Sequence, residues 1–438
     1  MPSVVLLLPT TAYRADDFLA AATRIGVSVI AVSDRCPVLA EEWTEGPVAI
    51  KFRDADRAAG EIADEVAAQH PVAIVGLDDQ TAVIAALASA KLGLPHNPPA
   101  AVRAARNKAE SRGRLRAAGI PTPRFEVASL DDLVPREEPL APAGNPLRPD
   151  ASRGDPRSAR PSIAVGFPCV VKPLVLSGSR GVMRADTPAE LSAALARIAR
   201  LVRSPQVAVR RDSALAQVIV EEFIPGPEVA LEGLLTDGQL HLLALFDKPD
   251  PLDGPFFEET LYVTPSRQPP EVQRAIEVAV GQGARALGLR EGPVHAELRL
   301  SPDGPRILEV AARSIGGLCG RALRFGVGVT LEELVLRHAL GETAPVPPRE
   351  LRASGVLMLP IRRGGVLQEV RGVDDARRVP LVEDVVITAH IHEEIVPLPE
   401  GSSYLGFIFA RGDDPAAVEA ALRDAGARID AVVAPKLH

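Results

Sequence analysis

The sequence predicts an α/β protein that opens with a parallel α/β domain and closes with an α+β domain. Two observations support this prediction. Apolar runs alternate with helical patterns over residues 1–95, and short strands accompany one helix after about residue 345. At 438 residues the chain is also too long for a single hydrophobic core, so we expect several domains.

The first 95 residues contain three apolar runs, each followed by a helical pattern. The runs are SVVLLLP, VSVIAVS and VAIVGL, and this alternation predicts a parallel sheet with right-handed crossovers. The turn GLDDQ at residues 76–80 would lie at the carboxyl edge of the sheet, where open α/β sheets bind ligands. Because the region has no GxGxxG motif, we do not expect a nicotinamide dinucleotide.

Composition and charge argue against several classes of protein. The net charge of −8 argues against a nucleic-acid partner, and no apolar run reaches the roughly 18 residues that a membrane span requires. Cys36, Cys169 and Cys319 lie far apart, so they predict neither a disulfide framework nor a zinc site. The short N-terminal apolar run predicts a first strand rather than a signal peptide. We therefore expect a soluble, cytoplasmic protein.

Between the two outer domains the pattern is less regular. Residues 102–119 predict one basic helix that ends at Gly119, and a strand follows at IPTPRFEV. Residues 134–163 are crowded with Pro, Arg, Asp and Gly and have no periodicity, which predicts a disordered surface insertion.

A lysine and a glycine-rich segment follow the insertion in VVKPLVLSGSRG, residues 170–181. Small residues allow backbone N–H groups to approach phosphate oxygens, and Lys172 supplies a positive charge. The segment lacks the Walker A spacing, so an ordinary surface turn explains it as well as a phosphate loop does.

The segment VIVEEFIPGPEVALEG, residues 218–233, joins a strand to paired carboxylates and a Pro-Gly-Pro break. The break would leave backbone groups near residues 222–224 without partners and available to an adenine edge, and Glu228 would accept from ribose hydroxyls. A solvated strand end explains the same pattern.

The segment HAELRLSPDGPRILEVAAR, residues 295–313, predicts a β-hairpin with two opposed carboxylates. Folding the chain about Asp303 places Glu297 opposite Glu309, with Ile307 on the same face as Glu309. Opposed like charges destabilise a sheet, but divalent cations between them would remove the conflict. Two exposed glutamates on a surface hairpin are the alternative.

These segments, together with NKAESRGRLRAAGIPTPRF at residues 107–125, resemble the ATP-grasp superfamily over about residues 100–345. Each motif alone is weak, but the four occur in the family's order with compatible spacing. The resemblance implies an ATP-grasp fold with an N-terminal domain at 1–95, a connecting helix and lid at 96–225, a catalytic and metal-binding region at 226–345, and a closing domain at 346–438.

The resemblance also implies roles for individual residues. Lys108 and Lys172 are implied to contact ATP phosphates, and a mobile loop is implied to close over them at Ser177, Gly178, Ser179, Arg180 and Gly181. The implied adenine and ribose contacts are Glu221, Glu222, Phe223, Ile224 and Glu228. Glu297 and Glu309 are the implied ligands of Mg²⁺, with Mn²⁺ as an alternative.

Ala311 departs from the common family pattern, in which an Asn provides a further metal ligand. The sequences HAE and EVAARSIGG instead look like the L-amino acid ligase (dipeptide synthetase) branch, and PFFEETLYVTPS at 255–266 is similar to that branch. In this branch Arg313, Lys172 and His295 would be catalytic. Arg313 would hold the substrate carboxylate, with His295, Gly316 and Gly317 also in contact with the substrate. A glutamate of the EET segment would meet the substrate amine, and we expect Glu259, with Glu258 as the alternative.

The resemblance implies an ATP-dependent carboxylate–amine ligase that forms an acyl phosphate and couples it to an amine. Its partners would be small carboxylates and amines, chiefly amino acids, and the family often forms homodimers. Two alternatives stay open at this point. One is an enzyme that activates bicarbonate or formate, and the other is a nucleotide-binding regulatory protein with a degenerate site.

Overall fold

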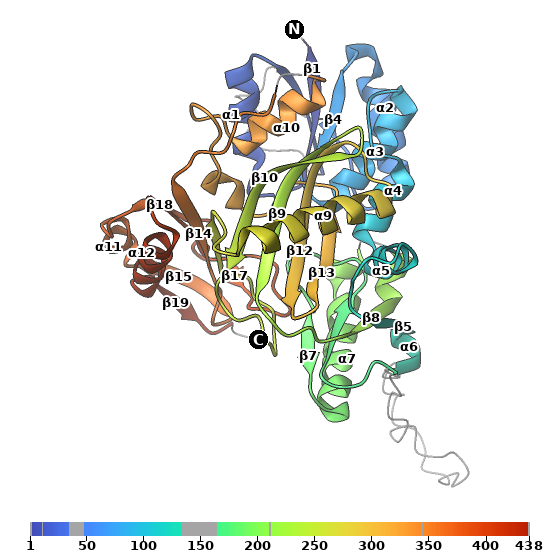
Figure 1. Ribbon diagram of the computed structural model, residues 1–438. Coiled ribbons are helices and arrows are strands. Elements are labelled where there is room, and N and C mark those ends of the chain that lie inside the picture. The colour runs from blue at the N-terminus through green and yellow to red at the C-terminus, as the bar shows by residue number, and fades with distance from the viewer. Residues whose placement is uncertain are drawn as a thin grey trace, which may run out of the picture.

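The computed structural model describes residues 2–10, 12–34, 48–133, 164–209, 212–342 and 345–436. The predicted insertion at 134–163 and Cys36 lie outside the described residues. Figure 1 shows the N-terminal domain at the top, the lid at the bottom and the C-terminal domain to one side of a long central sheet. Among the described residues, no helix has the length and apolar character needed to cross a bilayer.

The N-terminal domain is the predicted parallel α/β unit. Its strands are paired in parallel in the order β3-β2-β1-β4, with α1 between β1 and β2 and α2 between β3 and β4. These elements are β1 (Ser3–Leu8), α1 (Ala15–Ile25), β2 (Ser28–Ser33), β3 (Val48–Ala49), α2 (Ala55–Val66), β4 (Ala73–Gly76) and α3 (Asp79–Leu92). Asp78 caps α3 by accepting a hydrogen bond from the Thr81 N–H, so the GLDDQ turn is fixed at the sheet's carboxyl edge.

The prediction of one basic helix over 102–119 is wrong. The chain forms two helices, α4 (Pro99–Arg106) and α5 (Lys108–Ala117), which break at Asn107. Asn107 is extended, and its side chain accepts hydrogen bonds from the N–H groups of Ala109 and Glu110. Because this cap starts a new helix, Lys108 becomes its first residue.

The lid is a four-stranded sheet with the order β5-β8-β6-β7, covered by a helix. Its elements are β5 (Phe125–Ser129), α6 (Leu130–Leu133), β6 (Cys169–Pro173), β7 (Met183–Ala185), α7 (Pro188–Arg203), α8 (Pro205–Ala208) and β8 (Gln217–Glu222). The buried side of α7 packs on the sheet and gives the lid its own hydrophobic core.

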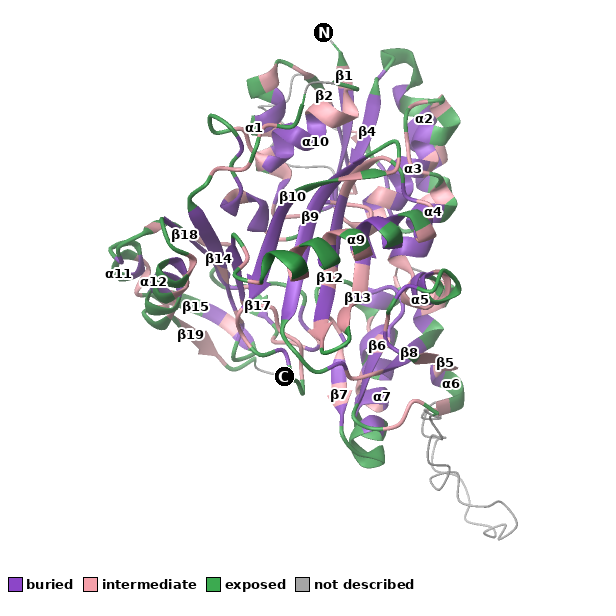
Figure 2. Ribbon diagram, in the orientation of Figure 1, coloured by how far each residue is buried: buried purple, intermediate pink, exposed green. Residues whose placement is uncertain are grey.

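The central sheet has eight antiparallel strands in the order β13-β12-β9-β10-β11-β14-β18-β16. They are β9 (Glu228–Thr236), β10 (Gln239–Lys248), β11 (Leu261–Thr264), β12 (Gly292–Ser301), β13 (Gly304–Ala311), β14 (Ala353–Leu359), β16 (Val382–Ile387) and β18 (Gly406–Gly412). The amphipathic helix α9 (Pro270–Leu287) covers one face, with its outer side exposed (Figure 2). Helix α10 (Leu331–Ala339) packs against the N-terminal domain.

The C-terminal region is α+β, but it does not form a separate sheet system. Strands β14, β18 and β16 extend the central sheet, and only β15 (Gly365–Arg371), β17 (Glu394–Ile395) and β19 (Asp430–Ala434) form a small sheet of their own. Helices α11 (Val373–Arg377) and α12 (Pro415–Ala427) complete this region. The domain boundary expected at residue 346 therefore divides strands that share one sheet.

Candidate active site

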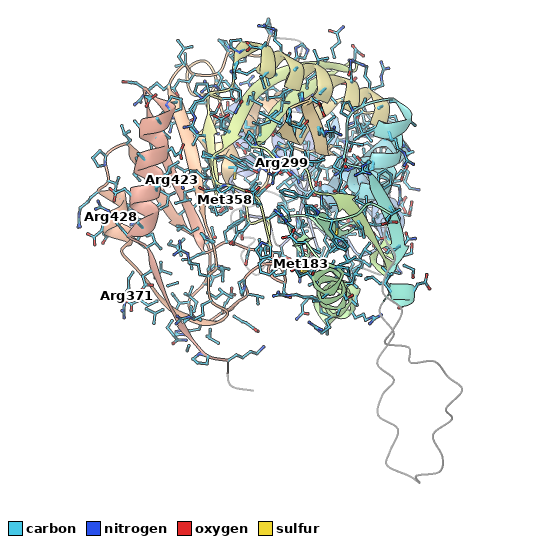
Figure 3. The ribbon with its side chains drawn as sticks, turned by 60° about the horizontal axis from the view of Figure 1, so that its bottom comes forward. Met183, Arg299, Met358, Arg371, Arg423 and Arg428 are labelled. Carbon is cyan, nitrogen blue, oxygen red and sulfur yellow. The ribbon has the colours of Figure 1, made fainter. Side chains whose placement is uncertain are left out.

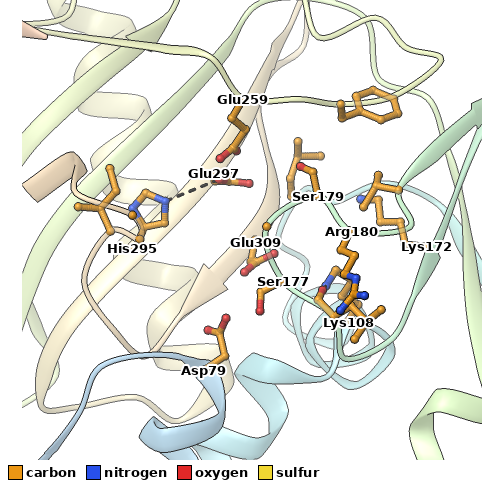
Figure 4. Close-up of a pocket in the computed structure, with 18 of the residues that line it drawn as sticks. Asp79, Lys108, Lys172, Ser177, Ser179, Arg180, Glu259, His295, Glu297 and Glu309 are labelled. Atoms are coloured by element: carbon orange, nitrogen blue, oxygen red, sulfur yellow. Dashed lines mark hydrogen bonds and ion pairs between the residues drawn. The ribbon is translucent and has the colours of Figure 1, made fainter. Parts of the chain in front are cut away.

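A cavity of about 340 Å³ lies where the lid, the central sheet, the C-terminal region and the N-terminal domain meet. Its lining includes every residue predicted for the site except Gly181 (Figure 4). In Figure 3 the bottom of the molecule comes forward, and Arg299 and Met358 of the cavity lie between the C-terminal domain and the lid, which carries Met183. Four segments distant in sequence thus contribute to one site.

The predicted hairpin is present, and Glu297 pairs with Glu309. The two-residue turn at Pro302-Asp303 pairs Ser301 with Gly304, and this register alone would place Leu308 opposite Glu297. A β-bulge at Leu308 adds one residue to β13 and brings Glu309 into position. The prediction that Ile307 shares a face with Glu309 is therefore wrong, because Ile307 packs in the hydrophobic core beneath α9.

The two predicted lysines enter the cavity from different elements. Lys108 donates from Nζ to the carbonyl of Leu176 at 2.7 Å, and Lys172 on β6 pairs with Glu221 Oε2 at 2.6 Å. Removal from water and the charge of Lys172 lower the pKa of Lys108, although Glu309 opposes this effect. Both lysines place positive charge at the same end of the cavity.

The predicted phosphate loop joins β6 to β7 and uses left-handed backbone conformations. The φ angles are +65° at Gly178, +54° at Ser179 and +74° at Gly181. At Gly181 a Cβ atom would also lie 2.8 Å from the Pro173 side chain, so this position requires glycine. Gly181 therefore packs against Pro173 outside the cavity, while Ser177–Arg180 line the cavity.

The hinge between β8 and β9 differs from its prediction at two backbone groups. The N–H groups of Glu222 and Phe223 donate to the carbonyls of Arg124 and Pro168, so they do not lack partners. The buried Glu221 carboxylate pairs with Arg112 and Lys172, and these cations outweigh burial and lower the pKa of Glu221. Glu222 pairs with Arg124 at 2.6 Å.

Three carboxylates on the hairpin side surround Lys248, the last residue of β10. Its Nζ lies 2.7 Å from Glu228, 2.5 Å from Glu259 and 3.1 Å from Glu297. Burial and the Glu297 carboxylate raise the pKa of Glu259 to about 8. Burial would also raise the pKa of Glu297, but Lys248 and His295 hold it well below its ordinary value. The proton on Glu259 and the Lys248 ammonium thus offset two of the three carboxylate charges, and Arg299, whose Nε lies 3.0 Å from Glu228, offsets the third.

His295 is buried on β12 and lies between two carboxylates. Its Nδ1 is 3.1 Å from Glu232 Oε2, and its Nε2 is 3.7 Å from Glu297. Burial would lower the pKa of His295, but its hydrogen bonds to these carboxylates raise it to about 9. Glu232 also accepts from the Ile315 N–H at 3.0 Å, which fixes the start of the Gly316–Gly317 turn.

Arg313 lies in the cavity and already contacts a carboxylate from the N-terminal domain. Its Nε and Nη2 donate to the two oxygens of Asp79 at 2.9 and 3.3 Å, and its Nη1 donates to the Ser314 carbonyl. Asp79 lies in the GLDDQ turn, so the expectation that this turn borders a ligand site agrees with the cavity lining.

The cavity offers two sets of carboxylate ligands. Glu228, Glu259 and Glu297 lie close enough together to hold one cation, and Glu309 lies across the hairpin from Glu297. All these donors are hard oxygens, which suit Mg²⁺ or Mn²⁺. Of the predicted pair, Glu297 belongs to the group within reach of one ion, Glu309 lies opposite it on the hairpin, and Ala311 adds no ligand.

Sequence reasoning missed Lys248, Glu232, Arg112 and the role of Asp79. Lys248 had a signal, because FDKP at its strand end repeats the pattern of VVKP at Lys172. Glu232 and Arg112 had none, because a single charge within an apolar strand or a basic helix does not identify its partner. Cys319 is buried, which raises the pKa of its thiol and disfavours the nucleophilic thiolate.

Comparisons with known proteins match two parts of the chain to known domains. Residues 165–322 match the ATP-grasp domain, and residues 357–434 match L-amino acid ligase C-terminal domain 2. The crystal structure of the L-amino acid ligase from Bacillus licheniformis is similar, with a TM-score of 0.79, 25% identity and coverage of 99% of both chains.

Two curated relatives are longer than the region that they share with this chain. Carnosine synthase 1 from Gallus gallus is 30% identical over 334 residues, which cover 72% of this chain and 33% of that protein. An uncharacterized protein of Sinorhizobium fredii is 26% identical over 351 residues, which cover 78% of this chain and 64% of that protein. The chain thus spans a third of the first relative and less than two thirds of the second.

Proposed function

We propose that this chain, which belongs to the ATP-grasp superfamily and carries an L-amino acid ligase C-terminal domain, is an ATP-dependent carboxylate–amine ligase. It would activate an amino acid or a similar carboxylate as an acyl phosphate and couple it to an amine. The products would be a dipeptide or amide, ADP and phosphate. One observation carries the proposal: the cavity sets two lysines and a glycine-rich loop against opposed carboxylates, with Arg313 beside them.

The nucleotide would lie at the lid end of the cavity. Lys108, Lys172 and the N–H groups of Ser177–Arg180 would meet its phosphates, since these are the donors and positive charges at that end. The hinge residues Glu221–Ile224 would border the base, and Glu228 the ribose. Because the Glu221 carboxylate already has two cationic partners, its role would be to hold Lys172 in place.

Glu297 and Glu309 would hold Mg²⁺ or Mn²⁺ at the phosphates, with Glu228 and Glu259 nearby. A cation bound there would offset negative charge on the phosphate oxygens during transfer. Lys248 would balance the carboxylates that the cation does not contact.

The reaction would proceed in two steps. A carboxylate oxygen attacks the γ-phosphorus, the bond to the ADP oxygen breaks, and an acyl phosphate forms. A neutral amine nitrogen then attacks the carbonyl carbon, phosphate leaves, and the nitrogen releases its proton. The acyl phosphate reacts with water as well as with amines, so the loop over the cavity would also serve to exclude water.

Arg313 would hold an oxygen of the reacting carboxylate. A guanidinium has five N–H donors, and its three contacts with Asp79 and Ser314 leave donors on Nη1 and Nη2 for that oxygen. Asp79 would then orient Arg313 before the substrate binds. The charged His295 would favour the negative charge that develops at the carbonyl, and Glu259 would accept from the substrate amine.

The test is phosphate release from Mg–ATP with amino acids supplied singly and in pairs, together with mass spectrometry of the product. We expect release that requires both a carboxylate and an amine, and we expect Glu309→Ala to lose at least about 100-fold in rate. Asp303→Asn, at the exposed turn of the same hairpin, is the control and should keep its rate. Release stimulated by bicarbonate or formate alone would contradict the proposal.

A further inference from the structure

A loop of the C-terminal domain, residues 396–402, lies against the phosphate loop of the lid. The Gly181 N–H donates to the Pro399 carbonyl at 2.8 Å, and Arg180 Nε donates to the Glu400 carbonyl at 2.8 Å. Arg197 on α7 binds the Glu400 carboxylate through Nε and Nη2, with Nη2 2.8 Å from Oε2. Glu400 therefore contacts both the phosphate loop and the helix that supports the lid.

The 396–402 loop is itself well fixed. The Gly401 N–H donates to the Pro397 carbonyl at 2.8 Å, and a Cβ atom at Gly401 would lie 1.9 Å from the Val396 carbonyl oxygen. Ser402 at its end and Tyr404 just beyond it line the cavity, and the Tyr404 N–H donates to the Tyr13 hydroxyl of the N-terminal domain at 3.2 Å. The loop thus gives the lid a rigid surface to close against.

We propose that Glu400 is a positioning residue that holds the phosphate loop closed over the nucleotide. Its bidentate contact with Arg197 is a geometry in which arginine–carboxylate pairs are both strong and directional. A contact made only when the lid is closed raises the population of the closed form, and nucleotide affinity rises with that population. The inference deepens the proposed function and rests on it, since closure protects the acyl phosphate from water.

The Arg197–Glu400 pair contributes little to folding. The two side chains are 37% and 35% exposed, and pairs with such exposure have small effects on the free energy of unfolding. Glu400→Ala should therefore stay folded and lose only closure, whereas Arg197→Ala also loses the contact of its guanidinium with the Phe256 ring at 5.0 Å. Arg203 offers a matched control, because it lies on the same helix and pairs with Asp131 at 3.0 Å with exposures of 40% and 45%, within the lid itself.

The experiment is calorimetric titration of the full chain with a non-hydrolysable ATP analogue and Mg²⁺. Glu400→Ala and Arg197→Ala should each weaken binding about three- to tenfold, the range expected for one bidentate pair. Arg203→Ala should bind the analogue with wild-type affinity. Glu400→Ala and Arg203→Ala should unfold at the same midpoint as the wild type. The charge-exchanged protein with Glu400→Arg and Arg197→Glu should recover most of the affinity. Wild-type affinity in Glu400→Ala, or an equal loss in Arg203→Ala, would overturn the proposal.

A second measurement separates this proposal from the proposed function. In a ligase, Glu400→Ala should release more phosphate per amide formed, because an open lid admits water to the acyl phosphate. If no substrate pair yields an amide with the wild type but the affinity difference persists, Glu400 keeps its positioning role and the proposed function fails. If the wild type forms an amide and Glu400→Ala matches it in affinity and in phosphate per amide, the positioning role fails alone.

Discussion

On the lid side of the cavity, one carboxylate, Glu221, is shared by two cations, Arg112 and Lys172. On the hairpin side, one cation, Lys248, is shared by three carboxylates, Glu228, Glu259 and Glu297. The lid side thus carries excess positive charge, which suits phosphates, whereas the hairpin side gathers carboxylates around one ammonium, and a metal ion could replace that ammonium and the proton on Glu259. The difference indicates where each ligand would bind, with the phosphates at the lid side and the metal ion at the hairpin side.

The largest expected change in stability comes from breaking the lid triad. Arg112 and Glu221 are each 1% exposed, so Arg112→Met leaves a buried carboxylate with Lys172 as its remaining partner. We expect the free energy of unfolding to fall by about 3 kcal/mol, as it does when one partner of a buried pair is removed. Urea denaturation measures the change.

Arg116→Met is the control for this prediction. Arg116 lies on the same helix, is exposed, and stacks on the Phe125 ring at 4.8 Å, so its loss should cost less than about 1 kcal/mol. Equal losses in the two variants would mean that the buried triad contributes nothing specific to the fold of the lid.

The triad also illustrates what sequence can and cannot predict. The sequence predicts a phosphate-binding role for Lys172 because its strand and the glycine-rich loop are adjacent in sequence. The parallel N-terminal sheet is likewise predicted from a local pattern, the alternation of apolar runs with helical patterns. Arg112 and Glu221 are more than a hundred positions apart, and nothing local connects them. The pairing of Arg313 with Asp79 was missed for the same physical reason, because only tertiary packing brings the two together.

Two local irregularities of the backbone account for the other differences between the predicted and the observed structure. Neither the side-chain cap at Asn107 nor the bulge at Leu308 changes the apolar pattern, so periodicity could not reveal them. Both affect the site: the first makes Lys108 the start of a helix, and the second places Glu309 opposite Glu297. Glu297 and Glu309 were nevertheless paired correctly, because a symmetric turn about Asp303 gives the same register as a two-residue turn followed by a bulge.

A smaller loss is expected when the cation of the hairpin cluster is removed. In Lys248→Met the three carboxylates lose their shared ammonium, but protonation of Glu259 relieves part of the repulsion. We therefore expect a loss of about 2 kcal/mol near pH 8, less than for an isolated buried charge. Added Mn²⁺ should restore more stability to this variant than to the wild type, because the ion can replace the ammonium.

The pH dependence of this variant follows from the pKa of Glu259. The folded chain keeps that proton up to about pH 8, whereas the unfolded chain loses it near the ordinary value of 4.5, so stability falls as the pH rises between them. Lys248→Met should steepen this fall toward pH 8, because loss of the ammonium raises the pKa of Glu259 further and the folded chain keeps the proton to higher pH. Unfolding at pH 6, 7 and 8 measures it, with the exposed Lys91→Met as control. A slope equal to that of the wild type would refute the assignment of Lys248 as the balancing cation.

The smallest change, and one of opposite sign, is expected at Lys108. Its pKa is lowered in the folded protein, so at neutral pH its charge opposes folding, and this penalty disappears only as the pH rises toward the ordinary value of 10.5. Lys108→Met should therefore raise the free energy of unfolding at pH 7 by about 1 kcal/mol or less, while nucleotide affinity falls. Lys172→Met is the counterpart, and it should destabilise the protein because Glu221 loses a partner. If both lysine variants are destabilised, Lys108 contributes to folding as Lys172 does, and the excess positive charge on the lid side is not maintained for the phosphates.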